Sequence, residues 1–118
     1  MNTRTGGIIG EAEAVRYLSS LGMTVLARNF RAVGGEIDLI VRDGSTVAFV
    51  EVKARRSPRF GAPEEAVTPS KMRNIVRAAT AYLQKYGLLD SPVRFDVLAI
   101  EGEDIRYYPS AFDATNFV

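Results

Sequence analysis

Hydrophobic and polar residues alternate most regularly between positions 35 and 53, and this alternation predicts a β-hairpin. Two runs rich in Val, Ile and Leu flank the segment Asp43-Gly44-Ser45, which is typical of a tight turn. Along the first run, apolar residues hold the odd positions Ile37, Leu39 and Val41, and charged residues hold even ones. Because side chains on a strand alternate between its two faces, the charged residues are expected to share one face.

Two acidic residues of this hairpin are expected to meet across its strands. Asp38 lies on the first strand and Glu51 on the second, where Lys53 follows on the same face as Glu51. If a two-residue loop pairs Asp43 with Thr46, Asp38 is directly opposite Glu51, with Cβ atoms ~4.5–5.5 Å apart. A loop of odd length would put the two acids on opposite faces.

A pair of facing carboxylates needs a compensating positive charge. At an effective dielectric of ~20, two carboxylates ~5 Å apart repel each other by roughly 3 kcal/mol. Lys53 can supply one charge, but a divalent cation satisfies two carboxylates better than an ammonium group on a flexible stem. The pattern therefore predicts a metal site.

The rest of the pattern predicts two helices and three further strands. The first helix is expected over residues 6–21, ended by Gly22, and the second is expected to open with Thr68 as cap and Pro69 as first residue and to end at Gly87. The strands are expected over residues 23–30, 93–100 and, as a short last strand, 105–108. The order αβββαβ with an extra C-terminal strand indicates an α/β protein, a mixed central sheet flanked by helices, in one domain over residues 1–118.

Glu11 on the first helix has two interpretations. It falls inside the expected apolar arc, which consists of Ile8, Ala12, Val15, Leu18 and Ser19. Either Glu11 joins the carboxylate pair from the helix side, or it lies at the margin of the packed face, where it reaches solvent or pairs with Arg28 or Arg31. The spacing favours neither interpretation.

Composition restricts the chemistry of the predicted site. The chain has no His and no Cys, which excludes zinc clusters, Ser-His-Asp and Cys-His nucleophile systems and a histidine general base. Only oxygen ligands remain, and these suit Mg²⁺ or Mn²⁺, which carboxylates hold together with substrate phosphate. Phosphodiester hydrolysis is the leading candidate reaction.

Charge is unevenly distributed although the formal net charge is only +1. Between Val52 and Gly87 the only acids are Glu64 and Glu65, against a basic set of Lys53, Arg55, Arg56, Arg59, Lys71, Arg73, Arg77 and Lys85. Such a segment after a carboxylate pair would attract the polyanion that the carboxylates repel. The alternative is a solvated loop and helix face.

The chain shows no pattern of a membrane or secreted protein. No apolar run approaches the ~20 residues of a membrane span. The first residues lack the apolar stretch of a secretory signal. We expect a cytoplasmic protein with no membrane partner.

Two further features each have a structural and a functional interpretation. Arg94 and Asp96 are expected to pair with each other on a strand surface, which we favour over a catalytic role. Gly34 and Gly35 fit a sharp turn or the close approach of a ligand, and the turn is favoured.

These residues together resemble the YraN family of small bacterial proteins, which are described as endonucleases. The resemblance covers nearly the whole chain and rests on Glu11, Gly35-Glu36-Ile37-Asp38, Phe49-Val50-Glu51-Val52-Lys53, Lys71 and Arg94-Phe95-Asp96. It implies a restriction-endonuclease-like, PD-(D/E)xK nuclease fold similar to that of archaeal Holliday-junction resolvases. Ile37 stands where the PD dipeptide has its proline, which weakens that motif without touching a ligand.

The resemblance also implies roles for individual residues. Asp38 and Glu51 would bind Mg²⁺ or Mn²⁺, with the Val52 carbonyl as a further ligand and support from Glu11. Lys53 would be the lysine of the E-x-K element, which orients the attacking water or neutralises the phosphorane. The residues expected to bind substrate are Arg55, Arg56, Arg59 and Lys71.

The implied function is metal-dependent hydrolysis of DNA, either branched or single-stranded. The alternative is a non-catalytic nucleic-acid-binding module in a repair, recombination or uptake assembly. Acids facing a phosphate backbone would only weaken such a module, so Asp38 and Glu51 argue against it. A third hypothesis is a structural protein with a surface ion-pair network. A homodimer is compatible with the resemblance, because junction resolvases cut two strands symmetrically.

Overall fold

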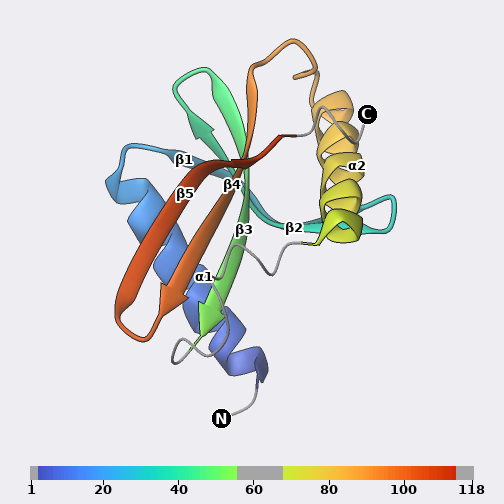
Figure 1. Cartoon of the computed structure of the whole chain (residues 1–118). Coiled ribbons are helices and arrows are strands. Elements are labelled where there is room, and N and C mark those ends of the chain that lie inside the picture. Colours follow the sequence, from blue (N-terminus) through green and yellow to red (C-terminus); the bar gives the residue numbers. More distant parts are fainter. Residues whose placement is uncertain (1–2, 56–67, 114–118) are drawn as a thin grey trace.

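A five-stranded mixed sheet in the order β1-β2-β3-β4-β5 separates two helices in the computed structural model of the protein (Figure 1). The structure describes residues 3–55 and 68–113. Along the chain the elements are α1 (Thr3–Ser20), β1 (Thr24–Ala32), β2 (Gly35–Asp43), β3 (Thr46–Arg55), α2 (Pro69–Lys85), β4 (Val93–Glu101) and β5 (Asp104–Phe112). This order confirms the predicted α/β class and the mixed sheet flanked by helices.

The pairing of the strands follows from the connections between them. β3 and β4 are parallel and are joined through α2, whereas all other neighbouring strands are antiparallel. Within the described ranges, neither helix combines the length and the apolar character that crossing a membrane requires.

Each helix covers its own face of the sheet. Alternate residues of β3 supply the two cores, with Val47 and Phe49 on the α2 side and Ala48 and Val50 on the α1 side. On the α1 side the helix packs through small residues, since a Cβ atom at Gly10 would lie 2.7 Å from the Ala54 Cβ. α1 and β3 therefore approach each other closely.

Most element boundaries agree with the sequence-based expectations. The hydroxyl of Thr68 caps α2 by accepting from the Lys71 amide at 3.2 Å, and Pro69 is the first helical residue, as predicted. α1 begins at Thr3, earlier than expected, and from Gly10 onward, where side chains are described, Ala14 and Leu18 are fully buried whereas Ser19 is exposed.

The last strand was predicted too short. β5 continues through Pro109 to Phe112 instead of stopping at residue 108. It is an edge strand of the sheet, and an edge strand tolerates proline because it does not need every N–H for pairing. A register shift near Ser110, whose φ is 56°, accompanies the continuation.

The Arg94–Asp96 pair is confirmed, but it is buried instead of lying on a strand surface. Asp96 is 0% exposed and accepts hydrogen bonds from Arg94 Nε, the Tyr107 hydroxyl and the Ser110 amide. Arg94 also donates to Asp43 at 3.0 Å. The network thus ties β4 to β5 and to the β2–β3 turn, which identifies it as a structural connection.

Strand β2 leaves β3 beyond Leu39. The β2–β3 pairs run from Asp43↔Thr46 to Leu39↔Val50, and beyond that point β2 continues with β1 towards α2 (Figure 1). The regular alternation also ends here, because Leu39 belongs to the core under α1 while Ile37 belongs to the core under α2. The separation leaves the Val52 amide without a β2 backbone partner.

Candidate active site

The separation of β2 from β3 brings Asp38 and Glu51 together. The loop between the strands has two residues, so the predicted Asp43–Thr46 register holds, and it runs as far as the pair Leu39↔Val50, directly before Asp38 and Glu51. Asp38 Oδ2 accepts a hydrogen bond at 2.8 Å from the amide of Val52, the residue after Glu51, and the two carboxyl groups are close enough for Glu51 to raise the pKa of Asp38. The expected convergence of the two acids is present.

Burial makes this pair difficult to ionise fully. Glu51 is only 7% exposed. Burial, and secondly the negative charge of Glu51, raise the pKa of Asp38 from 3.8 to about 7, although the Val52 hydrogen bond acts in the opposite direction. The two carboxyl groups can thus hold one proton between them near neutral pH.

Two lysines from different elements complete the cluster. Lys71, in the first turn of α2, places Nζ 2.8 Å from Glu51 Oε1, while Lys53 Nζ on β3 is 3.6 Å from the same oxygen. Burial lowers the pKa of Lys53, and the neighbouring amine of Lys71 lowers it further. Burial also opposes the charge on Lys71, but its interactions with Glu51 and Lys53 outweigh this and raise its pKa. Lys71 is therefore the principal cationic partner of Glu51.

The donor set suits a hard divalent cation. Two close carboxylates with oxygen donors only are what Mg²⁺ and Mn²⁺ prefer in proteins. The pKa of Asp38 is raised first by burial and then by the charge of Glu51, so the ionised pair is costly without further positive charge. A cation at this position would supply the missing charge.

Glu11 is not part of this pair. Both of its carboxylate oxygens accept from Asn29 Nδ2 at 3.1 Å, so neither Arg28 nor Arg31 is the partner considered above. The described residues contain no group of three or more acidic side chains close enough to hold one metal ion. Asn29 occupies β1 between the pairs Arg28↔Leu39 and Phe30↔Ile37, which is the position beside Asp38. Glu11 is therefore bound to the residue of β1 that neighbours Asp38 in the sheet, and not to Asp38 or Glu51 themselves.

Asn29 was not identified from the sequence. Its φ of 50° is in the left-handed region, which asparagine adopts more readily than most residues. An asparagine inside an otherwise apolar and basic strand was the only indication available.

Three of the expected substrate-binding residues cannot be placed. Arg56 and Arg59 lie outside the described residues, as does the side chain of Arg55. Lys71, the fourth, is in contact with the acids. For Val52, the hydrogen bond to Asp38 involves its amide, so the expected role of its carbonyl stays a prediction.

The raised pKa of Asp38 predicts a pH dependence of stability. Between pH 4 and 7 the folded protein keeps a proton on Asp38 that the unfolded chain has lost, so the free energy of unfolding falls as pH rises through this window. From pH 5 to 8 we expect the free energy of unfolding of wild type to fall by about 2 kcal/mol more than that of Asp38→Asn. Urea unfolding of both proteins at each pH measures this difference. Equal changes in the two proteins would contradict it.

Comparison with known proteins places the chain in a family. Residues 10–100 match the model of the uncharacterised protein family UPF0102. A UPF0102 protein of Geobacter sulfurreducens is 51% identical over 112 residues, covering 91% of this chain and 88% of the relative. A UPF0102 protein of Geotalea daltonii is 46% identical over 117 residues, covering 95% and 92%. The chain therefore belongs to the uncharacterised protein family UPF0102.

Proposed function

We propose that the protein is a Mg²⁺- or Mn²⁺-dependent endonuclease that hydrolyses phosphodiester bonds in DNA, with branched or single-stranded DNA as its substrate. The observation that carries the proposal is the close pair of acids Asp38 and Glu51, which lies beside two lysines where β2 leaves β3. A binding surface for DNA has no use for buried acids that repel phosphate, whereas a hydrolytic metal site requires them.

We also propose that the fold is of the restriction-endonuclease-like, PD-(D/E)xK type. The order α1-β1-β2-β3-α2-β4 and the position of the two acids on the adjacent strands β2 and β3 support this assignment. One fold hosts many functions, so the proposed function rests on the residues of the site and not on the fold.

Asp38 and Glu51 would hold the cation, with the Val52 carbonyl as an additional ligand. A bound Mg²⁺ or Mn²⁺ supplies a water of lowered pKa and neutralises charge on the phosphate. Lys53 is suited to orient that water and to exchange a proton at Nζ, because its pKa is lowered by burial and by Lys71. Lys71 would exchange its ion pair with Glu51 for one with a substrate phosphate, because phosphate and carboxylate oxygens both accept hydrogen bonds from an ammonium group.

The experiment that tests this function is a cleavage screen over duplex, flap, four-way junction and single-stranded DNA with Mg²⁺ or Mn²⁺. Wild type is expected to cut at least one of these substrates, and Asp38→Ala and Lys53→Ala are expected to cut none at a measurable rate. Binding by all three proteins without cleavage by wild type would overturn the nuclease proposal and favour a non-catalytic nucleic-acid-binding module.

A further inference from the structure

The turn between β1 and β2 holds an apolar side chain in an unfavourable backbone conformation. Val33 and Gly34 have φ values of 54° and 77°, so both central residues of this two-residue turn are left-handed. Glycine adopts this conformation freely, but a β-branched residue there is a true outlier. Val33 is also 64% exposed, the most exposed large apolar side chain in the described part of the chain. Neither strand formation nor core packing accounts for a valine at this position.

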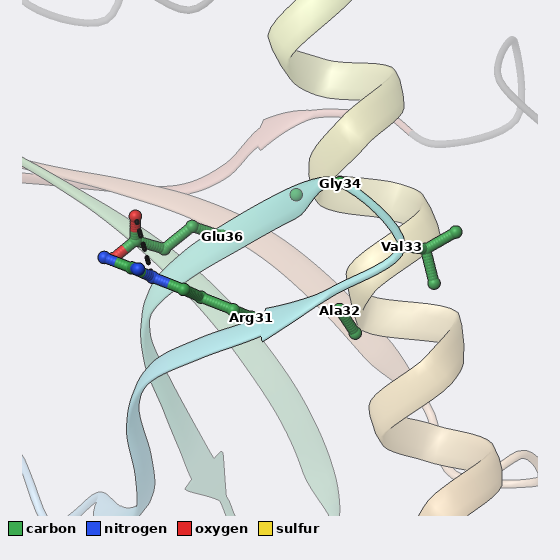
Figure 2. Close-up of a pocket in the computed structure, with 6 residues that line it drawn as sticks. Arg31, Ala32, Val33, Gly34 and Glu36 are labelled. Atoms are coloured by element: carbon green, nitrogen blue, oxygen red, sulfur yellow. Dashed lines mark ion pairs between the residues drawn. The ribbon is translucent and has the colours of Figure 1, made fainter.

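The base of the β1–β2 turn is packed against α2, while its tip is exposed to solvent. A Cβ atom at Gly35 would lie 2.2 Å from the backbone oxygen of Asn74, so β2 starts in direct contact with the backbone of α2. This contact, and not a bound ligand, explains the close approach that Gly35 permits. Figure 2 shows the turn lying beside α2, with the exposed side chain of Val33 at its tip. The valine is therefore presented on a rigid support.

Arginines lie on the stem of the turn and on the part of α2 that the turn contacts. Arg31, on the stem, is 77% exposed and only loosely paired with Glu36, at 3.6 Å (Figure 2). Together with Glu36 it lines an open hollow of about 470 Å³. On α2, the exposed residues Arg73 and Arg77 directly precede Asn74 and Ala78, the residues that Gly35 approaches. The surroundings of the valine thus favour a polyanion.

The turn also lies within reach of a substrate held at the acidic pair. Four residues lie between Val33 and Asp38, so the two are five steps apart along the chain and at most about 16 Å apart at ~3.3 Å per residue. Nucleic acid advances ~3.4 Å per base step along each strand, so this span corresponds to roughly five steps.

We propose that the β1–β2 turn is a second DNA contact, in which Val33 packs against unstacked bases at a branch point roughly five base steps from the bond that is cut. The inference rests on the proposed function and adds a specificity element to it. Apolar side chains that contact or enter a base stack are a recurrent way for proteins to select deformable or branched DNA. Arg31, Arg73 and Arg77 would bind the flanking phosphates without selecting a sequence.

The test compares binding of a four-way junction and a matched linear duplex, both fluorescently labelled, without divalent metal so that no DNA is cut. Val33→Gly is expected to weaken junction binding about tenfold and to change duplex binding by less than about twofold. Val33→Leu, which keeps an apolar side chain, should retain the junction preference. The matched control Arg77→Ala should weaken the binding of both substrates alike and reduce the dependence of binding on salt concentration.

Folding does not limit this test, because glycine relieves the left-handed strain and Val33→Gly should unfold at a temperature at least as high as wild type. A 2-aminopurine base at the branch point should brighten with wild type and not with Val33→Gly. If wild type binds junctions and Val33→Gly binds them equally well, the second contact does not exist although the nuclease proposal stands. If wild type binds no nucleic acid, both fail.

Discussion

Replacing Glu51 by Gln is expected to lower the rate of DNA cleavage by at least about a thousandfold, because it removes one of the two charges available to hold the cation. The amide has nearly the same size as the carboxylate, so the packing around this 7% exposed side chain is preserved. Lys71 loses its partner, but it is 39% exposed and can reach water. Initial rates with Mg²⁺ on the preferred substrate measure the effect.

The matched control for this variant is Glu36→Gln on the neighbouring strand. Glu36 is an acid of the same type whose side chain is 43% exposed and pairs with Arg31. The Glu36→Gln protein should cleave no more than about twofold more slowly than wild type, because it keeps both acids that hold the cation and frees Arg31 to bind phosphate. A Glu51→Gln protein that cuts as fast as Glu36→Gln would remove Glu51 from the mechanism.

Asp96→Ala is expected to destabilise the protein by about 3–5 kcal/mol, because it leaves buried partners without their acceptor. The carboxylate is fully buried and accepts from Arg94, Tyr107 and the Ser110 amide. Burial and the bond to Asp96 raise the pKa of Tyr107, so its hydroxyl stays a donor over the accessible pH range. Urea unfolding monitored by circular dichroism gives the free energy.

A control variant in a solvent-exposed ion pair tests whether the expected loss of stability comes from the burial of the Asp96 carboxylate or from its charge alone. Glu36→Ala removes the same kind of group from an exposed pair, and its cost should be below about 1 kcal/mol. Equal, small losses in Asp96→Ala and Glu36→Ala would show that the network around Asp96 does not stabilise the fold.

Local features of the sequence were sufficient for most of the fold. The two-residue turn after Asp43 sets the register of β2 and β3, and this register runs to the pair Leu39↔Val50, directly before Asp38 and Glu51. Thr68 and Pro69 mark the start of α2 because their chemistry is specific to a helix N-terminus.

The features that the sequence did not reveal all depend on distant contacts. β2 leaves β3 after Leu39 because the hairpin with β1 packs against α2, at the close contact of Gly35 with Asn74. Lys71 reaches Glu51 only because α2 begins beside β3. The burial of Asp96 depends on Tyr107 from another strand. No spacing along the chain predicts contacts of this kind.

The central claim is that Asp38 and Glu51 together bind a divalent cation, and calorimetric titration of Mn²⁺ into the protein tests it most directly. Wild type is expected to bind one ion per chain, more tightly at pH 8 than at pH 6, because binding must displace the proton that Asp38 keeps below its raised pKa of about 7. Asp38→Asn and Glu51→Gln should each lose this binding. Absence of binding to wild type at millimolar Mn²⁺, or equal binding by all three proteins, would contradict the account.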